Sequence, residues 1–167
     1  RLYDRSEIET RYSVVKDFSL PKNEWTFFEK EGSTTVEKRM KLYFELAPQL
    51  GLEAVSNCVT ANELKKITHL ITVSCTGMSA PGLDIQLMQQ LGLDSDIRRS
   101  SVNFMGCYAA IHALKQANDI CRSDQQANVL VVDVELCTIH FQNNYSLDNI
   151  ASSLLFADGA AAARISN

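Results

Sequence analysis

The 167-residue sequence lacks any hydrophobic run approaching the roughly 18 residues that a membrane-spanning helix needs. Its longest apolar stretches, 67–75 and 128–136, are short and are interrupted by His69 and Asp133. The chain begins with Arg1 rather than Met, and its first residues lack the apolar core of a secretory signal. We therefore expect no membrane span, and we expect that residue 1 is not the biological start of the protein.

Cysteine pairs at metal-binding spacing are also absent. The five cysteines are an odd number, they lie 14 to 32 residues apart, and none forms a C-x-x-C motif. These spacings exclude the usual zinc sites and argue against a disulfide framework, so we expect free thiols, no metal site and a cytoplasmic protein. The 16 Lys and Arg residues are scattered, and against 20 Asp and Glu they give a net charge of −4. This charge distribution gives no indication of nucleic-acid binding.

Short apolar segments alternate with amphipathic segments over the last hundred residues. The apolar segments predict four strands, over 67–75, 100–105, 128–136 and 160–165. The amphipathic segments predict helices over 82–93, 107–122 and 146–155. Strands separated by helices are typical of a mostly parallel sheet with helices on both faces, so the fold class is α/β. Because no linker rich in Pro or Gly divides the chain, we expect a single domain over 1–167.

A helical excursion is expected ahead of this α/β region. Apolar residues recur at spacings of four and three within 5–18, and a long amphipathic stretch covers 34–64. Near the middle of the long stretch, Pro48 and Gly51 are expected to kink or interrupt the helix, because proline removes a backbone hydrogen bond. The N-terminal third is therefore predicted to be helical.

The residues around Cys107 suggest a nucleophile. Val102 and Phe104 alternate with polar residues as in a strand, Gly106 follows, and a helical pattern begins directly afterwards. Cys107 therefore lies at a strand-to-helix junction, where unsatisfied N–H groups and the helix dipole favour a thiolate. This arrangement suggests a cysteine nucleophile that performs acyl transfer. The alternative is a packed thiol, which is the usual role of a buried cysteine.

Three histidines could serve as the partner base of Cys107. His112 lies five residues later on the same predicted helix and points away, and His69 opens a strand and is interpreted as structural. His140 follows the strand over 128–136, whose C-terminal end should lie at the same sheet edge as Cys107. His140 is therefore the candidate base.

Cys75 ends the first predicted strand and should reach the same edge of the sheet. It could line a pocket beside Cys107, and a core thiol is an equally good interpretation. The remaining cysteines, Cys58, Cys121 and Cys137, are interpreted as packed thiols.

Three blocks of the sequence, in order, resemble the type III polyketide synthases, the chalcone and stilbene synthase-like enzymes of the thiolase superfamily. The blocks are HLITVSCTGMSAPGLDIQLMQQLGL, NFMGCYAAIHALKQANDI followed by ANVLVVDVE, and LLFADGAAAARI. The resemblance runs over the whole chain and includes the opening YDRSEIETRY. It implies the N-terminal αβαβα half of a thiolase-like fold.

The resemblance also implies a reaction. In that family the cysteine of the G-C motif takes an acyl group from a CoA thioester, and Cys107 occupies its place. Decarboxylative condensation with malonyl-CoA then extends the chain, so the implied substrates are acyl-CoA and malonyl-CoA, without a further cofactor, in a homodimer. The implied site residues are Phe156 as gatekeeper between CoA tunnel and cavity, Cys75, Thr76 and His140 in the cavity, Arg1 and Arg5 at the CoA phosphates, and Ala80 in a loop that reaches the partner's cavity.

The sequence departs from the family in two small ways and one large one. Ala157 and Ala110 stand where family members carry, or often carry, glycine, which should alter packing rather than chemistry. The family's catalytic histidine and asparagine lie in a second α/β half, and this sequence ends at Asn167, about where the first half ends. His140 would then be a cavity residue rather than the base, and the isolated chain would form no polyketide.

Two other functions are compatible with these residues. The chain could be a catalytically incomplete thiolase-fold module that binds or dimerises, because the decarboxylation machinery lies outside it. It could also be related to the ketoacyl-ACP synthases III and use an acyl carrier protein, although the CTGMSAPG block and the basic N-terminal residues disfavour this interpretation. The leading hypothesis is the nucleophile-bearing N-terminal segment of a larger synthase.

Overall fold

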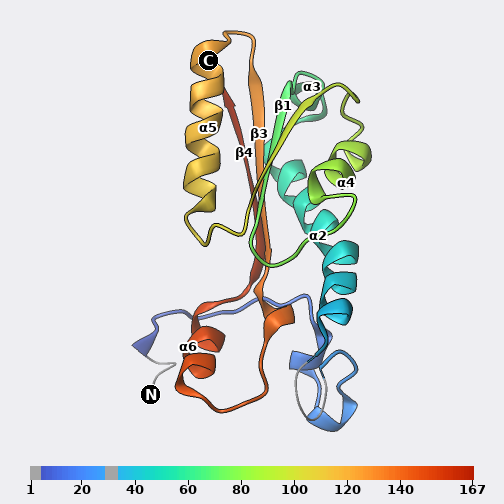
Figure 1. Ribbon diagram of the computed structural model, residues 1–167, viewed down its shortest axis with the longest axis vertical. Helices are drawn as coiled ribbons and strands as arrows, with labels where there is room; N and C mark the ends of the chain where they lie inside the picture. The colour runs from blue at the N-terminus through green and yellow to red at the C-terminus, as the bar shows by residue number, and fades with distance from the viewer. Residues whose placement is uncertain (1–4, 29–33) are drawn as a thin grey trace.

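The computed structural model describes residues 5–28 and 34–167, which form an α/β structure around a four-stranded sheet (Figure 1). In spatial order the strands are β2 (Arg98–Asn103), β1 (His69–Ser74), β3 (Asn128–Leu136) and β4 (Asp158–Ser166). Strand β1 pairs in parallel with both β2 and β3, whereas β4 runs antiparallel to β3. The prediction of a mostly parallel sheet is confirmed.

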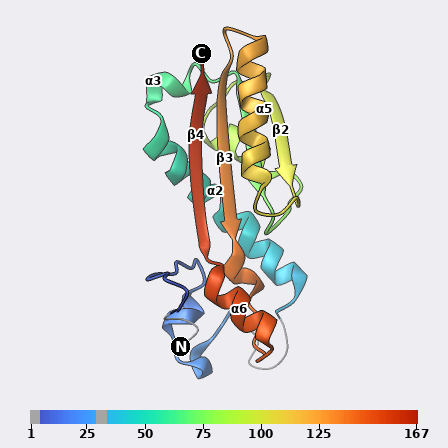
Figure 2. The same ribbon diagram turned by 90° about the vertical axis from the view of Figure 1, so that its left-hand side faces the viewer.

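Helices cover both faces of this sheet (Figure 1 and Figure 2). Helix α5 (Ala109–Ser123) packs on one face, and α2 (Val36–Cys58) and α4 (Leu83–Gln90) pack on the other. Helix α6 (Leu147–Leu155) lies at the end of the sheet where β1 and β3 finish, and α3 (Ala61–Leu64) lies at the opposite end. Three 3-10 turns complete the described elements: η1 (Lys16–Ser19), η2 (Lys22–Glu24) and η3 (Cys137–His140).

Strand β3 contributes to two hydrophobic cores. Leu130 and Val132 pack in the core on the α2 side, whereas Val129 and Val131 pack with the alanines of α5. Successive side chains of a strand point to opposite faces, so a continuous apolar run buries both faces at once. This double burial positions the C-terminal ends of β1 and β3 rigidly next to the start of α5.

The helix predicted over 5–18 does not form. Most of this segment has no helical backbone before η1, and Glu7 has a left-handed φ of 56°. Long-range hydrogen bonds hold the segment against β4: the backbone N–H of Asp158 donates to the Tyr12 carbonyl at 2.9 Å, and the Val14 N–H donates to the Asp158 carboxylate at 2.7 Å. These tertiary contacts override the helical pattern of the sequence.

Helix α2 is not interrupted at Pro48, so of the two outcomes predicted there, a kink or an interruption, the interruption does not occur. It is continuous to Cys58, and the helical stretch breaks instead before α3, where Thr60 is the N-cap. Pro48 is buried, and a Cβ added at Gly51 would lie 3.1 Å from a methyl group of Leu87 on α4. The small residue lets α2 pack closely, and this packing compensates for the hydrogen bond that proline cannot make.

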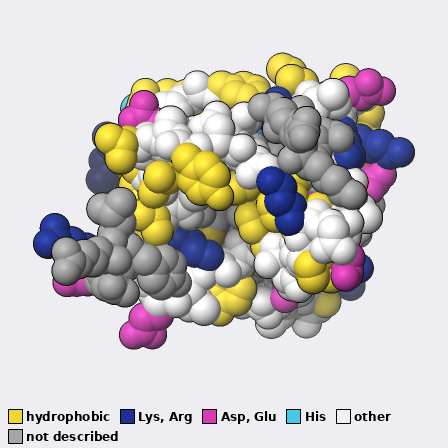
Figure 3. All heavy atoms as spheres, turned by 90° about the horizontal axis from the view of Figure 1, so that it is seen from below, with side chains coloured by type: hydrophobic (Ala, Val, Ile, Leu, Met, Phe, Trp, Pro, Cys, Tyr) yellow, Lys and Arg dark blue, Asp and Glu magenta, His cyan; other side chains and the backbone are white. Residues whose placement is uncertain are grey.

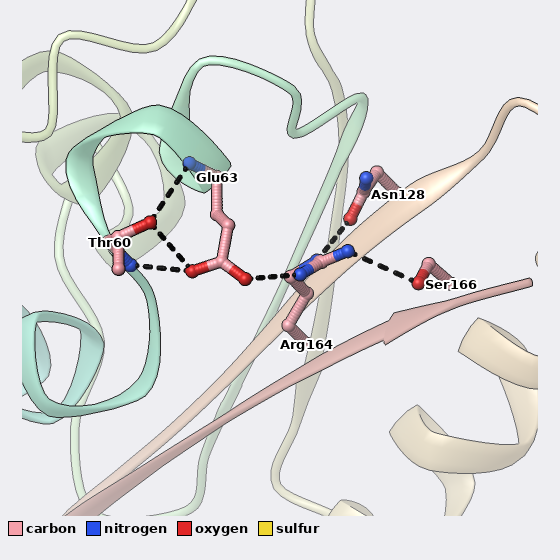
Figure 4. A network of polar contacts seen from close by, with 5 residues as sticks. All are labelled: Thr60, Glu63, Asn128, Arg164 and Ser166. Carbon is pink, nitrogen blue, oxygen red and sulfur yellow. Dashed lines mark hydrogen bonds and ion pairs between the residues drawn. The ribbon is translucent and has the colours of Figure 1, made fainter.

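A polar network fixes the end of the sheet that is remote from α6 (Figure 4). Arg164 on β4 donates to Glu63 of α3 at 2.6 Å and to Asn128 of β3 at 2.7 Å. Glu63 also accepts from the backbone N–H of Thr60 at 2.8 Å. The hydrogen bonds from Thr60, together with the charge of Arg164, hold the pKa of Glu63 below its ordinary value. The network ties α3 to two strands, so we interpret it as structural.

Tyr43 of α2 anchors the loop that follows β1. The ring is buried, and its hydroxyl donates to the Ser74 hydroxyl at 2.7 Å. A Cβ added at Gly77 would lie only 2.2 Å from the Tyr43 ring. Only glycine fits here without displacing the ring, so this contact fixes the loop that carries Cys75 and Thr76.

We predict that Gly77→Ala lowers the free energy of unfolding by about 1–3 kcal/mol, because the new methyl group overpacks the site against Tyr43. Gly159→Ala is the matched control, since nothing lies within 4 Å of a Cβ added there. Urea denaturation of both variants measures the difference. If the two variants were equally stable, the packing of Gly77 against the ring would be contradicted.

Candidate active site

A cavity of about 410 Å³ lies at the end of the sheet where β1 and β3 finish and α5 begins. This volume is within the range of small-molecule binding sites. Five of the residues singled out in the sequence line it: Cys75, Thr76, Cys107, His140 and Phe156. Four separate segments of the chain therefore meet at one place.

Cys107 lies between β2 and α5, at the junction predicted from the sequence. Phe104 and Gly106 have left-handed φ angles of 56° and 89°, so the chain turns sharply just before the thiol. No side chain caps the start of α5 at Ala109, and such helix starts favour negative charge nearby. Cys107 is the one exposed residue among the five cysteines, all of which are free. Cys107 also lines the cavity, so its thiol lies where a nucleophile could reach a ligand bound there.

Cys75 lies directly beside the turn that carries Cys107. The backbone N–H of Gly106 donates to the Cys75 sulfur at 3.3 Å, and the thiol contacts the Gly106 carbonyl oxygen at 3.6 Å. The end of β1 is thereby held against the residue that precedes the candidate nucleophile. Cys75 lines the same cavity as Cys107.

Glu135 on β3 holds the loop that follows β1. One of its oxygens accepts from the Cys75 N–H at 2.8 Å, and the other accepts from the Thr76 hydroxyl at 2.6 Å. The same Thr76 oxygen accepts from the backbone N–H of Leu136 at 2.8 Å. Both carboxylate oxygens are thus engaged in positioning the cavity wall.

His140 is held by two hydrogen bonds. Its Nε2 lies 2.6 Å from the Thr76 carbonyl oxygen, and its Nδ1 lies 3.1 Å from the guanidinium of Arg39. A carbonyl only accepts and a guanidinium only donates, so Nε2 carries the hydrogen and Nδ1 accepts. Neither ring nitrogen is free to take the proton of Cys107. This geometry favours the interpretation of His140 as a cavity residue over that of a base.

Asp133 also lines the cavity. In the sequence this residue stands out only as an interruption of an apolar run. It lies two residues before Glu135 on β3, hence on the same face of the sheet. Its Oδ1 is buried and has no hydrogen-bond partner among the described residues. Burial, and secondly the charge of Glu135, raise the pKa of Asp133 to about 6.

The thiols of Cys121 and Cys137 are more buried than that of Cys107. Burial, together with the nearby charge of Glu135, raises the pKa of Cys137 to about 11, and burial also raises the pKa of Cys121. Thiols with raised pKa values supply little thiolate at neutral pH. Cys137 nevertheless lines the cavity, which its interpretation as a packed thiol did not anticipate.

Phe156 contributes to the walls of two cavities. It directly follows α6, and it lines both the Cys107 cavity and a neighbouring cavity of about 270 Å³. Arg11 lines the second cavity, and its Nε and Nη2 atoms are buried there without a hydrogen-bond partner among residues 5–28 and 34–167. Seen from this end, exposed apolar side chains lie between basic ones on the surface (Figure 3).

Three other predicted site residues lie elsewhere. Ala80 is exposed in the loop before Pro81 and does not line the cavity of the single chain. Arg5 is exposed near the start of the described chain, and Arg1 lies outside the described residues. Within the described ranges no group of three or more metal-ligating side chains gathers, and none of the helices is long and apolar enough to cross a membrane.

A period-two signal in the sequence could have identified the missed cavity residues. Asp133, Glu135 and Cys137 alternate along β3 and its end, so they lie on the face that meets α5. Polar residues that interrupt the C-terminal end of a buried parallel strand are placed where α/β folds bind ligands. The same reasoning that selected His140 would have selected Asp133 and Glu135.

We predict that Asp133→Asn stabilises the protein at neutral pH by about 1 kcal/mol, after allowance for partial solvent screening. Because the folded-state pKa of Asp133 is about 6, above its ordinary value of 3.8, the unfolded chain gives up this proton more readily. The wild type therefore loses stability as the pH rises from about 4 to about 7, and Asn removes that loss. Thermal melts at pH 5 and pH 7.5 should show a gain at both values that is larger at pH 7.5. A gain that is larger at pH 5 would contradict the assignment.

Comparisons with known proteins identify the family to which the chain belongs. Residues 1–167 match the family described as chalcone and stilbene synthases, N-terminal domain. The chain is 34% identical to "Probable polyketide synthase 1" of Dictyostelium discoideum, over 97% of this chain and 5% of that protein. It is 32% identical to "Type III polyketide synthase C" of Arabidopsis thaliana, over 93% of this chain and 41% of that protein.

Solved structures show the same relationship. The C-terminal type III polyketide synthase domain of a type I/III hybrid from Dictyostelium superimposes with a TM-score of 0.85 and 31% identity, over 99% of this chain and 45% of that one. Germicidin synthase from Streptomyces coelicolor, a type III polyketide synthase, gives a TM-score of 0.71 and 29% identity, over 77% of this chain and 34% of that one. The chain thus spans less than half the length of these relatives. It belongs to the chalcone and stilbene synthase family, as an N-terminal domain of the type III polyketide synthases.

Proposed function

We propose that Cys107 loads an acyl group from acyl-CoA, for decarboxylative condensation with malonyl-CoA. The observation that carries this proposal is the exposed Cys107 thiol at the start of α5, where it opens into a cavity of about 410 Å³. Membership in the type III polyketide synthases supports it, because Cys107 stands at the G-C motif of the resembling block. The chain would thus be a CoA-dependent acyltransferase domain.

The loading step is a thioester exchange. The Cys107 thiolate attacks the carbonyl carbon of the acyl-CoA, a new carbon–sulfur bond forms, and the bond to the CoA sulfur breaks. CoA leaves as a thiolate and takes up a proton. The uncapped start of α5 favours negative charge near the reacting sulfur, and the apolar cavity wall at Val73, Ala109 and Ala110 accepts the acyl chain.

The neighbouring cavity is the proposed path of the CoA arm. Phe156 lines both cavities, which supports its role as the gatekeeper between tunnel and acyl site. The Nε and Nη2 atoms of Arg11 are buried without a hydrogen-bond partner among the described residues, which is costly, and Arg11 lines the second cavity. Both observations support a negatively charged ligand in that cavity. We propose that Arg11 joins Arg1 and Arg5 in binding CoA phosphates.

Condensation requires groups that residues 5–28 and 34–167 do not place at Cys107. Decarboxylation of malonyl-CoA develops an enolate whose charge needs preorganised donors, and both nitrogens of His140 are engaged elsewhere. We propose that a second half of the synthase supplies these donors and that this chain alone forms no polyketide. Exposed apolar side chains beside the site, including Phe104, Tyr108 and Ile111, would pack against that half or against a second protomer of a homodimer.

We predict that iodoacetamide labels Cys107 before the other four cysteines, because it alone combines exposure with a position at a helix start. Incubation with acyl-CoA should add one acyl group, detected by intact mass, and Cys107→Ala should abolish the adduct. Cys58→Ser, a thiol remote from the cavity, is the control and should retain it. Preferential labelling of Cys58, or an adduct that survives in Cys107→Ala, would reject Cys107 as the nucleophile.

We predict that Arg11→Met slows acyl loading from acyl-CoA about tenfold, because a charge-assisted hydrogen bond to phosphate is lost. Labelling of Cys107 by iodoacetamide, which carries no phosphate, should keep its rate. Arg122→Met, at the exposed end of α5, is the matched control and should change neither rate. If Arg11→Met slowed both reactions equally, Arg11 would support the fold rather than bind CoA.

A further inference from the structure

One carboxyl group in the Cys107 cavity has no part in the loading step or in holding the wall. Both oxygens of Glu135 are engaged with Cys75 and Thr76, at 2.8 Å and 2.6 Å. Asp133, on the same face of β3, has a buried Oδ1 without a hydrogen-bond partner in the described part of the chain. Asp133 also lines the cavity, so its carboxyl group, which no described residue engages, is an acceptor available to a ligand there.

The neighbours of Asp133 in the sheet form no contact that requires a carboxyl group at this position. In the sheet it pairs with Val73 of β1 and Ala161 of β4, neither of which offers a side-chain donor. The strand is otherwise a run of apolar residues from Val129 to Val134, into which valine would fit. A buried carboxyl without a partner costs free energy, which its pKa of about 6 also reflects. A residue that destabilises the free protein in this way is typical of a binding site.

We propose that Asp133 determines specificity: its free oxygen accepts a hydrogen bond from a hydroxyl group on the acyl chain attached to Cys107. The cavity would then prefer a hydroxylated chain to a hydrocarbon chain of the same length. This inference rests on the proposed acyl loading at Cys107, and it adds the class of acyl group that the site takes.

A hydroxyl fits better than a charged amine. An ammonium group needs up to three acceptors, and the oxygens of Glu135 are already occupied by Cys75 and Thr76. A hydroxyl needs one acceptor, and Asp133 offers it within a wall that is otherwise apolar at Val73 and Ala109. Sites with a buried polar group reject ligands that leave the group unpaired, so the selectivity should be measurable.

The test uses alkylating probes, so that it does not depend on acyl transfer. Cys107 is alkylated by pairs of N-substituted iodoacetamides of equal length, N-butyl against N-(3-hydroxypropyl) and N-hexyl against N-(5-hydroxypentyl). Peptide mapping gives the ratio of hydroxyl to hydrocarbon rates at Cys107, in the wild type and in Asp133→Val and Asp133→Asn. The matched control is Asp96→Asn, because Asp96 is an exposed carboxylate outside the cavity.

At one chain length or the other, the wild-type ratio should exceed that of Asp133→Val about tenfold, as expected for a hydrogen bond to a carboxylate. Asp133→Asn keeps an acceptor oxygen and should keep part of the preference, and Asp96→Asn should match the wild type. Ratios that are equal in the wild type and both Asp133 variants at both lengths would overturn the proposal while leaving acyl loading intact. Failure of every probe to alkylate Cys107 would instead reject the proposed nucleophile, and this inference with it.

Discussion

The carboxylate of Glu135 is the interaction on which the site depends. It joins the end of β3 to the backbone of Cys75 and the hydroxyl of Thr76, where β1 becomes a loop. Cys75 in turn contacts Gly106, so the turn that carries Cys107 is held by the same chain of bonds. Three segments from different parts of the sequence thus share one anchor. Hydrogen bonds to a carboxylate are stronger than neutral ones, which suits an anchor at the edge of a sheet.

The sheet behind this anchor buries apolar side chains on both faces, and two acidic residues of β3 lie at its end next to the cavity. Leu70 and Val73 of β1 are buried on opposite faces of the sheet. Asp133 and Glu135 lie in the C-terminal part of β3, next to the cavity. Burial of the apolar side chains stabilises the sheet, whereas burial of the carboxyl group of Asp133 lowers the free energy of unfolding. Binding sites in α/β folds commonly combine these two requirements at the carboxyl ends of parallel strands.

Local pattern predicted the elements best where burial and periodicity agree. The predicted bounds of β3, 128–136, are those observed, because a run of apolar residues buried on both faces leaves little ambiguity. The segment 5–18 could not be predicted in this way, since its backbone follows hydrogen bonds to Asp158, a residue far along the chain. At the site, the glycine and the helical pattern locate Cys107, and the alternation of Asp133 with Glu135 indicates the same end of the sheet. The sequence alone does not show that Asp133 lacks a side-chain partner in the sheet, because its neighbours Val73 and Ala161 come from distant segments.

We have proposed that Cys107 carries an acyl chain, and that chain would occupy the cavity whose wall Glu135 positions. A crystal structure of the protein after reaction with an acyl-CoA would test this placement. We expect electron density continuous with the Cys107 sulfur, running into the cavity past Cys75 and Asp133. Density on another thiol, or a chain on Cys107 that points into solvent with the cavity empty, would contradict it.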